Sequence, residues 1–335
     1  MLRRRFLGGI VASGSVLFSA PRAVGAAAAA ATGPTTQIRL GYIGNVCEAA
    51  SYAAPDSGVF RRNGVSARLV RFGSESALIT ALGGGSIDAA SMNLPALLRP
   101  LESKLDVRVV AGLHAGCLRV VSPDPLEVAW LRDLRGKKIA TDRLGGPSMN
   151  LLSALMGSQG IDPRSDVSWH VYDTSGLTTA LEAKSVECVA ASDPLAYFLI
   201  ASKLAQPYLD TSDGGFTCGQ DFAHGHHCFL ALHGGLVRDR PALASAITRS
   251  YVATSAAIPA HAGIEALRDA RGGYADDDIS QTIGMLSSYL WNPSTDLVAE
   301  EIELSARDFQ AVGLLHPDTD PHELAIRAFA DVLHA

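Results

Sequence analysis

Short apolar stretches alternate with stretches of helical periodicity in two parts of the chain. The first part covers residues 37–92 and the second covers residues 138–203. Strands that alternate with helices form βαβ units, in which parallel strands make a sheet and helices cover it. The pattern therefore predicts an α/β fold with two lobes, each a mostly parallel sheet flanked by helices. The predicted strands are residues 37–43, 67–72, 87–92, 138–141, 167–171 and 186–191, and the predicted helices are residues 49–62, 76–82, 148–159, 178–183 and 194–203.

Two longer apolar runs, residues 107–121 and 227–236, stand between and after these series. Gly116 interrupts the first run and a Gly-Gly pair closes the second, so each run can pass from one lobe to the other. Beyond Pro241 the chain has helical periodicity broken by proline and glycine, which predicts a helical C-terminal part.

The first 26 residues have the order of a secretory signal peptide. Arginines at the start precede an apolar stretch that ends at Ala20, and small residues lead to a cleavage site near Ala26. The Arg-Arg-Arg-Phe-Leu segment at residues 3–7 also resembles the twin-arginine export motif. We therefore expect residues 1–26 to be a twin-arginine-like signal peptide that is removed on export to the periplasm, and residues 27–35 to form a linker.

Charge and cysteine count restrict the function further. The chain has 335 residues and a formal net charge of −6, but four of its 28 Lys and Arg residues lie in the signal-like segment, which has no acidic residue. The rest of the chain has 34 acidic side chains against 24 basic ones, which excludes a general nucleic-acid-binding role. Five widely spaced cysteines exclude a small disulfide framework and leave at least one thiol unpaired.

The turns that follow the predicted strands are candidate binding sites, because open α/β sheets bind ligands outside the carboxyl ends of their strands. The Gly-Gly-Pro-Ser turn at residues 145–148 either suits an anion, through its amides and the helix dipole, or is simply a capped helix start. Arg143 beside it can pair with an anionic solute or form a surface salt bridge. The candidates are Asn45, Ser74, Glu75 and Asn93 in the first lobe, and Arg143, Gly145, Gly146, Ser148 and Asp193 in the second.

Several motifs, in this order along the chain, carry a resemblance to a known family. They are a small-residue helix at residues 49–54, Gly-Val-Phe-Arg-Arg-Asn-Gly-Val at 58–65, Leu-Gly-Gly-Gly-Ser-Ile-Asp-Ala-Ala at 82–90, Leu-Arg-Asp-Leu-Arg-Gly-Lys-Lys-Ile-Ala at 131–140 and Gly-Ser-Gln-Gly-Ile-Asp-Pro at 157–163. With them, residues 36–330 resemble the solute-binding proteins of ABC importers of the nitrate, sulfonate and taurine type, which also include riboflavin- and thiamine-precursor binders.

The resemblance implies a two-lobed periplasmic-binding-protein fold of type II, with two crossover strands between the lobes. It places lobe 1 at residues 36–117 plus 229–335 and lobe 2 at residues 118–228. It also implies a monomer without a cofactor that captures a small solute, anionic and sulfonate- or nitrate-like or a related organic molecule, in the interlobe cleft. The lobes close by rotation, and the protein delivers the solute to a membrane permease with its cytoplasmic ATPase.

If this architecture holds, scattered cysteine and histidine residues converge on the cleft, and three interpretations stay open. They can bind a soft metal or metal complex, form a disulfide between Cys218 and Cys228 or between Cys47 and Cys117, or make a polar wall around an organic or oxyanion ligand. Cys188, between valines of a predicted strand, is interpreted as a core thiol. The further candidates for solute binding are Cys47, His114, Cys117, His227 and Cys228, and the possible metal ligands are Cys47, Cys117, Cys218, His226, His227 and Cys228.

An enzyme is the remaining alternative, because some relatives of this fold make a pyrimidine with a cysteine-rich run and iron. The chain has no such contiguous run and no Gly-x-Ser-x-Gly, P-loop or His-Glu-x-x-His motif. A nucleophilic pair of Cys117 or Cys228 with His227 is conceivable. We expect a binding protein and not an enzyme, with a thiamine-precursor-type pyrimidine binder or enzyme as the second alternative.

Overall fold

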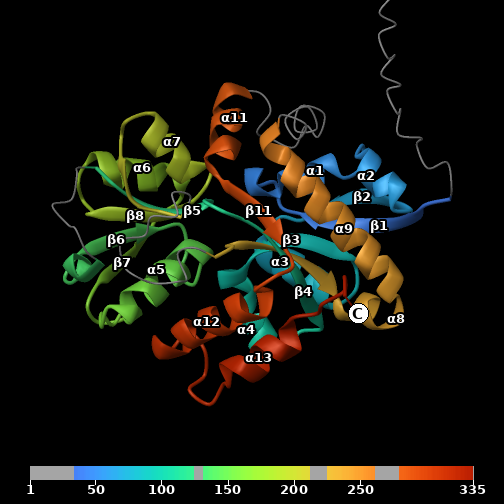
Figure 1. Cartoon of the computed structure of the whole chain (residues 1–335). Coiled ribbons are helices and arrows are strands. Elements are labelled where there is room, and N and C mark those ends of the chain that lie inside the picture. Colours follow the sequence, from blue (N-terminus) through green and yellow to red (C-terminus); the bar gives the residue numbers. More distant parts are fainter. Residues whose placement is uncertain (1–33, 124–130, 212–224, 261–278, 335) are drawn as a thin grey trace, which may run out of the picture. The chain divides into compact units, whose positions relative to one another are not determined.

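The computed structural model describes residues 34–123, 131–211, 225–260 and 279–334 (Figure 1). The predicted signal peptide at residues 1–26, most of the linker and the candidate ligand Cys218 lie outside the described residues. The described chain contains two β-sheets flanked by helices, so the predicted α/β class is confirmed. Among the described residues, no helix is long and apolar enough to cross a membrane.

The first sheet has six strands in the order β11-β4-β10-β3-β1-β2. Strand β1 is parallel to both β2 and β3, whereas β10 is antiparallel to its two neighbours β3 and β4, and β11 is antiparallel to β4. Its strands are β1 (Thr36–Tyr42), β2 (Val65–Arg71), β3 (Ala89–Asn93), β4 (Val107–Ala115), β10 (Cys228–His233) and β11 (Leu290–Ser294).

The second sheet has five strands in the order β7-β6-β8-β5-β9. Strand β6 is parallel to β7 and β8, and β5 is antiparallel to β8 and β9. Both sheets are thus mixed and not mostly parallel as predicted, because only the strands of the βαβ units run parallel and the other strands enter in the opposite direction. The strands are β5 (Leu118–Ser122), β6 (Lys138–Thr141), β7 (Ser168–Val171), β8 (Cys188–Ser192) and β9 (Gln206–Asp210).

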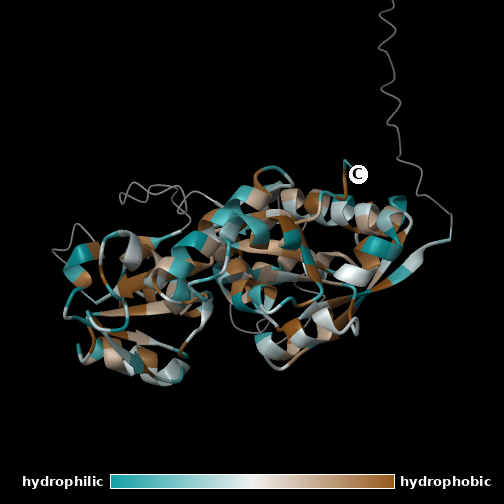
Figure 2. Cartoon of the chain, turned by 90° about the horizontal axis from the view of Figure 1, so that it is seen from below, coloured by the Kyte–Doolittle hydropathy of each residue, from teal (hydrophilic) through white to brown (hydrophobic). Residues whose placement is uncertain are grey.

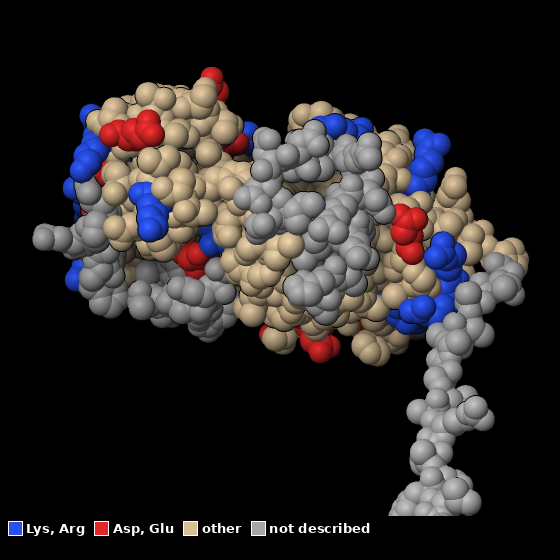
Figure 3. Space-filling model, turned by 90° about the horizontal axis from the view of Figure 1, so that it is seen from above, with Lys and Arg blue, Asp and Glu red and all other residues tan. Residues whose placement is uncertain are grey.

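Helices cover both sheets, and the apolar colour in Figure 2 is concentrated on the strands and on the helix faces that pack against them. On the face shown in Figure 3, basic and acidic side chains are interspersed over a largely uncharged surface. The helices are η1 (Val46–Glu48), α1 (Ala49–Ala53), α2 (Gly58–Arg62), α3 (Glu75–Gly83), α4 (Leu94–Glu102), η2 (Leu131–Leu134), α5 (Pro147–Ser158), α6 (Thr174–Glu182), α7 (Leu195–Ala201), α8 (Gly234–Asp239), α9 (Pro241–Ala257), η4 (Ile258–Ala260), α11 (Ile279–Ser288), α12 (Val298–Ala311) and α13 (Pro321–Ala328).

Proline residues account for the main differences from the predicted elements. The predicted helix 49–62 is two short helices, α1 and α2, because Pro55 lacks an amide donor and the Ser57 hydroxyl then caps α2 by accepting from the Val59 amide at 3.2 Å. The sequence pattern also missed β9 and β11, each of which contains a proline and lies at the edge of its sheet. An edge strand tolerates proline because one side of it needs no ladder hydrogen bond.

The chain passes from the first sheet to the second between β4 and β5. Gly116 has a φ of +105°, a left-handed conformation that glycine adopts without a steric penalty. The Thr211 hydroxyl, which follows β9, accepts a hydrogen bond from the Gly116 amide at 3.1 Å and donates one to the Leu118 carbonyl at 2.8 Å. One buried hydroxyl thus ties the end of the second sheet to the link between β4 and β5.

Candidate functional site

A pocket lies at the carboxyl ends of β1 and β3, which is the edge where open α/β sheets bind ligands. It is narrow, and most of the roughly 270 Å³ of unoccupied space around it is open to solvent. Five predicted site residues are among its walls, together with Glu48, which the sequence analysis did not select. The pocket is lined by Ile43, Asn45, Cys47, Glu48, Glu75, Leu78, Ser91, Met92, Asn93 and Cys228.

Three buried thiols lie together at this pocket. Cys47 is in η1, Cys117 links β4 to β5, and Cys228 begins β10, yet the three sulfur atoms all lie within 4.8 Å of one another. The Sγ atoms of Cys117 and Cys228 are 3.3 Å apart, and both cysteines are free thiols. The Asn93 Oδ1 atom accepts from the Cys228 thiol at 2.9 Å and lies 3.6 Å from the Cys117 sulfur.

The three thiols have different pKa values because they are buried and hydrogen-bonded to one another. Hydrogen bonds from Cys228 and Cys47 lower the pKa of Cys117 below the ordinary value of a thiol, although burial opposes this effect. The hydrogen bond to Cys117 and burial raise the pKa of Cys47, and burial followed by the bond to Cys117 raises the pKa of Cys228. Cys117 is therefore the member of the cluster that loses its proton first.

Glu48 organises the turn that holds Cys47. Its carboxylate accepts hydrogen bonds from the amides of Ile43 at 3.0 Å, Gly44 at 2.9 Å and Asn45 at 2.7 Å. Burial raises the pKa of Glu48 to about 7, although these amides favour its charged form. Because these three amides donate to the Glu48 carboxylate, they are not directed at a ligand. The Asn-x-x-Glu spacing of residues 45–48, typical of a capping box, was the sequence signal for this role.

Arg143 and Glu75 connect two candidate turns, one beside each sheet. The Arg143 Nη2 atom is 2.5 Å from Glu75 Oε2, so the salt bridge joins the turn before α5 to the start of α3. The Glu75 side chain is only 9% exposed, whereas that of Arg143 is 47% exposed. Burial raises the pKa of Glu75 in spite of its basic partner. The sequence analysis left a surface salt bridge open for Arg143, and the structure contains such a pair with a carboxylate of the pocket wall.

The other predicted residues of these turns have local roles. Ser74 is exposed and caps α3 by accepting from the Ala77 amide at 3.2 Å. Gly146 is the N-cap residue of α5, and Gly145 before it is exposed with a φ of +69°. Ser148 is buried and its hydroxyl lies 3.0 Å from that of Ser192 at the end of β8. None of these four residues lines the pocket described above.

The His114 ring is turned away from the sulfur atoms. Its Nε2 atom is 3.2 Å from the Cys47 carbonyl oxygen and its Nδ1 atom is 3.3 Å from the Ala115 carbonyl oxygen. The ring stacks on Tyr289 at 5.0 Å between centroids and lies 4.5 Å from the ring of Trp291. Burial lowers the pKa of His114. It thus acts as a neutral support behind Cys47.

His226 also has partners other than the thiols. Its Nδ1 atom is 2.9 Å from a Glu301 carboxylate oxygen and its Nε2 atom is 2.9 Å from the Asn292 carbonyl oxygen. Burial lowers the pKa of His226, but Glu301 and the Asn292 carbonyl outweigh it and raise the value. His227 is 1% exposed, and burial lowers its pKa to about 3. Of the predicted metal ligands that are described, only the three cysteines come together as one group.

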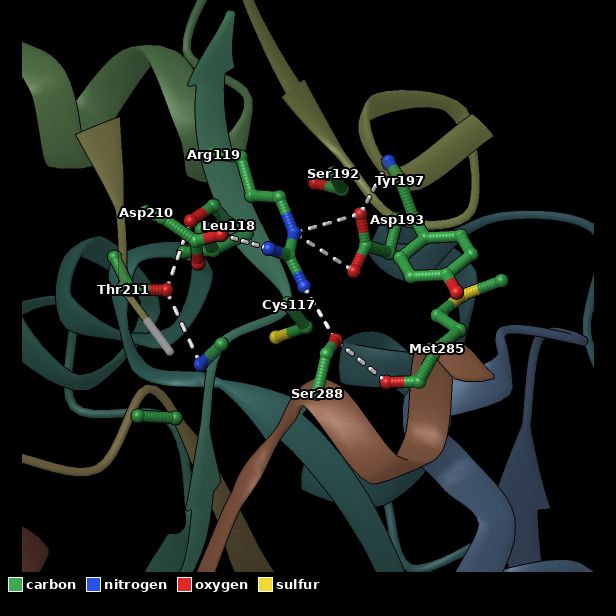
Figure 4. Close-up of polar contacts among 12 residues, drawn as sticks. Cys117, Leu118, Arg119, Ser192, Asp193, Tyr197, Asp210, Thr211, Met285 and Ser288 are labelled. Atoms are coloured by element: carbon green, nitrogen blue, oxygen red, sulfur yellow. Dashed lines mark hydrogen bonds and ion pairs between the residues drawn. The ribbon is translucent and has the colours of Figure 1, made fainter. Parts of the chain in front are cut away.

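Arg119, which the sequence analysis did not select, is the centre of a buried ion network (Figure 4). The side chain is 3% exposed; its Nε atom is 3.2 Å from Asp193 and its Nη1 atom pairs with Asp210. Its Nη2 atom donates to the Ser288 hydroxyl of α11 at 2.8 Å, and the guanidinium lies 6.0 Å from the centroid of the Tyr197 ring. Burial raises the pKa of Asp193 to about 7 against the effect of Arg119. Asp193 thus pairs with Arg119. An arginine inside the apolar run 107–121, flanked by Leu118 and Val120, was the sequence signal for such a network.

Known structures share this fold. The periplasmic aliphatic sulphonate binding protein SsuA from Escherichia coli has a TM-score of 0.69 at 17% identity, over 88% of this chain and 92% of that one. The alkanesulfonate-binding protein SsuA from Xanthomonas axonopodis pv. citri, bound to MOPS, has a TM-score of 0.65 at 17% identity, over 87% and 98%. The periplasmic nitrate-binding protein NrtA from Synechocystis PCC 6803 has a TM-score of 0.67 at 15% identity, over 90% and 87%.

These neighbours are binding proteins by description and not enzymes. The two sheets with flanking helices therefore form the fold of the periplasmic binding proteins, as the resemblance implied. A search of the curated proteins found no match. A family model matches residues 31–267, which is more than half of the chain. The chain therefore belongs to the NMT1-like family.

Proposed function

We propose that this chain is the extracytoplasmic solute-binding component of an ABC importer and that it binds a small anionic solute. The observation that carries the proposal is the pocket at the carboxyl edge of β1 and β3, in a fold that matches sulfonate- and nitrate-binding proteins over most of both chains. The partner is then a membrane permease with its cytoplasmic ATPase, and the chain acts as a monomer without a cofactor or catalytic step.

The Arg143–Glu75 pair supports an anionic solute. Arg143 is half exposed in the turn between β6 and α5, so it can exchange its carboxylate partner for another anion at little desolvation cost. Burial raises the pKa of Glu75 and so disfavours the charged form of this competing carboxylate. A sulfonate or nitrate oxygen then replaces Glu75 as the partner of Arg143 through a charge-assisted hydrogen bond.

The experiment is calorimetric titration of the purified chain with taurine, short alkanesulfonates and nitrate, on the wild type and on Arg143→Ala. We expect one of these anions to bind and Arg143→Ala to weaken it about tenfold to a hundredfold, because a hydrogen bond to a charged group is worth about 1.5–3 kcal/mol. Arg135→Ala is the matched control, since Arg135 is exposed and pairs with Asp166 at 3.2 Å. Equal affinity of wild type and Arg143→Ala would refute the role of Arg143, and no binding of any anion would refute the solute class.

We further propose that residues 36–117 plus 229–335 and residues 118–228 are two lobes that close on the solute. The support is the glycine in the link between β4 and β5: Gly116 has a left-handed conformation, and small backbone rotations are possible there. Small-angle scattering tests closure: the radius of gyration should fall when a bound anion is added. An unchanged radius at saturation contradicts closure but leaves the binding role intact.

The N-terminal arginines support export to the periplasm by the twin-arginine route. Replacing Arg3 and Arg4 together with Lys should stop export, because the twin-arginine motif is read by its receptor as an address. Cell fractionation with an antibody against the chain measures the result, and N-terminal sequencing of the exported protein should place cleavage near Ala26. Unchanged periplasmic yield of the Lys variant refutes the twin-arginine route.

A further inference from the structure

We propose that the thiols of Cys47, Cys117 and Cys228 form a three-sulfur site for one soft metal ion, with Cu(I) as the best match. This site goes beyond the proposed solute-binding function and does not depend on it. The three residues come from η1, from the link between the sheets and from the start of β10, so only the folded chain brings them together.

The sulfur positions already fit one ion. Metal–thiolate bonds of about 2.3 Å place three sulfur atoms about 4 Å from one another around the metal. The three sulfur atoms all lie within 4.8 Å of one another, and the shortest separation, between Cys117 and Cys228, is 3.3 Å. Small side-chain rotations that open this shortest separation are therefore enough to admit an ion.

The surroundings hold the three sulfur atoms in place. The turn of Cys47 is fixed by the amides that donate to Glu48. The Cys117 carbonyl accepts from the Asp193 amide at 3.0 Å, and Cys228 is paired with Asn93 and His114 in the first sheet. Binding at prearranged ligands costs less entropy than binding at mobile ones.

The kind of donor selects the ion. Thiolates prefer soft ions such as Cu(I), whereas carboxylates and carbonyls suit Mg²⁺ and Ca²⁺. Structural Zn²⁺ sites have four ligands, and the rings of His114 and His226 are directed at carbonyl and carboxylate oxygens instead of the sulfur atoms. Three sulfur atoms without an imidazole therefore match a three-coordinate Cu(I) better than a four-coordinate Zn²⁺.

The pocket provides the entry path. Cys47 and Cys228 are both in its wall, so an ion that enters from solvent meets two of its three ligands directly. Asn93 Oδ1 accepts from the Cys228 thiol before binding and loses this donor when the thiol ionises. Each thiol that coordinates the ion releases its proton to solvent, and the oxidation state of copper does not change.

The test is an anaerobic titration of the reduced chain with Cu(I) against a chromogenic Cu(I) chelator. Native mass spectrometry and the ultraviolet thiolate-to-copper absorption measure the product. We expect one copper per chain, with a mass gain of one copper minus one proton, because a singly charged ion replaces one proton at a given charge state. Cys117→Ser and Cys228→Ser should each lower the affinity by at least about a hundredfold, because even indirect partners of metal ligands change affinity by about 10–100-fold. Cys188→Ser is the matched control, since this buried thiol is not part of the cluster and should retain wild-type affinity.

Each alternative result has a defined meaning. Loss of copper to the chelator by the wild type, or equal retention by the cluster variants and the wild type, overturns the site. A Cys117–Cys228 disulfide mapped in protein isolated from the periplasm overturns it as well, and so does Zn²⁺ that Cu(I) does not displace. If a serine variant does not fold, as judged by circular dichroism, the copper stoichiometry and the thiolate-to-copper absorption of the wild type still decide the question. Anion titration of the same metal-free samples tests the importer role separately.

Discussion

Two arginines from the part of the chain with the second sheet contact helices beside the first sheet. Arg119 of β5 contacts Ser288 of α11, and Arg143 before α5 contacts Glu75 of α3, but the two arginines differ in burial. Arg119 is 3% exposed and is bonded to two carboxylates and a hydroxyl, whereas Arg143 is 47% exposed and has one carboxylate partner. A buried ion pair cannot be broken without leaving an uncompensated charge, but an exposed one is replaced by water at little cost. We infer that Arg119 maintains the structure and that Arg143 is free to change partners.

The largest expected effect comes from the buried network. Arg119→Met should lower the free energy of unfolding by about 3–5 kcal/mol, because it leaves Asp193 and Asp210 without their buried partner. Urea denaturation followed by circular dichroism measures the change. Arg135→Met is the control, and this exposed pair should cost about 1 kcal/mol or less. Equal losses in the two variants would contradict the distinction between buried and exposed pairs.

The buried Thr211 hydroxyl tests whether hydrogen bonds between uncharged groups also stabilise the fold. Thr211→Val removes the acceptor of the Gly116 amide and the donor to the Leu118 carbonyl, and it leaves a buried amide unsatisfied. We expect a loss of about 1–3 kcal/mol in the free energy of unfolding. In Thr179→Val the side chain is exposed on α6 and the lost bond to the Ser175 carbonyl is solvated, so the change should stay within about 0.5 kcal/mol. A Thr211→Val protein as stable as the wild type would show that this link carries no energy.

Neutralising Glu75 tests whether Arg143 is free to bind an anion. Glu75→Gln removes the carboxylate that competes with an anion, so the affinity for the bound anion should rise several-fold, up to about tenfold, which corresponds to about 1.4 kcal/mol. Titration calorimetry measures the affinity, and stability should change by about 1 kcal/mol or less. Weaker anion binding by Glu75→Gln would mean that Glu75 itself contacts the solute.

The smallest expected effect concerns a half-exposed pair in the first sheet. Asp88 accepts from the Arg39 side chain at 2.7 Å, and this pair lowers the pKa of Asp88 although burial opposes the effect. A lowered carboxyl pKa contributes stability above the unfolded value of about 3.9, and that contribution disappears as the pH falls through the folded value. Asp88→Asn should therefore cost about 1 kcal/mol or less at pH 7 and a smaller amount at pH 2. Urea denaturation at both pH values checks this, and a cost that is undiminished at pH 2 would point to lost hydrogen bonds instead of charge.

Much of the fold was predictable because it depends on local patterns. Strand β6 was predicted with its observed bounds, and α5 within one residue at each end, since alternating apolar runs and a Gly-Pro helix start are signals contained in a few adjacent residues. Strands β9 and β11 were missed because a proline is tolerated only at a sheet edge, and the edge position depends on which strand lies beside it.

Local sequence patterns were enough to identify the turns from which a site can be built, because Cys47, Glu75, Asn93 and Arg143 follow strands whose periodicity is local. The partners of these side chains depend on the tertiary structure. The thiols of residues 47, 117 and 228 lie together, the ring nitrogen atoms of His114 lie near carbonyl oxygens, and Asp193 pairs with Arg119. The physical reason is that a buried polar group takes whichever partner packing brings within hydrogen-bond distance, and that choice depends on segments far apart in the chain.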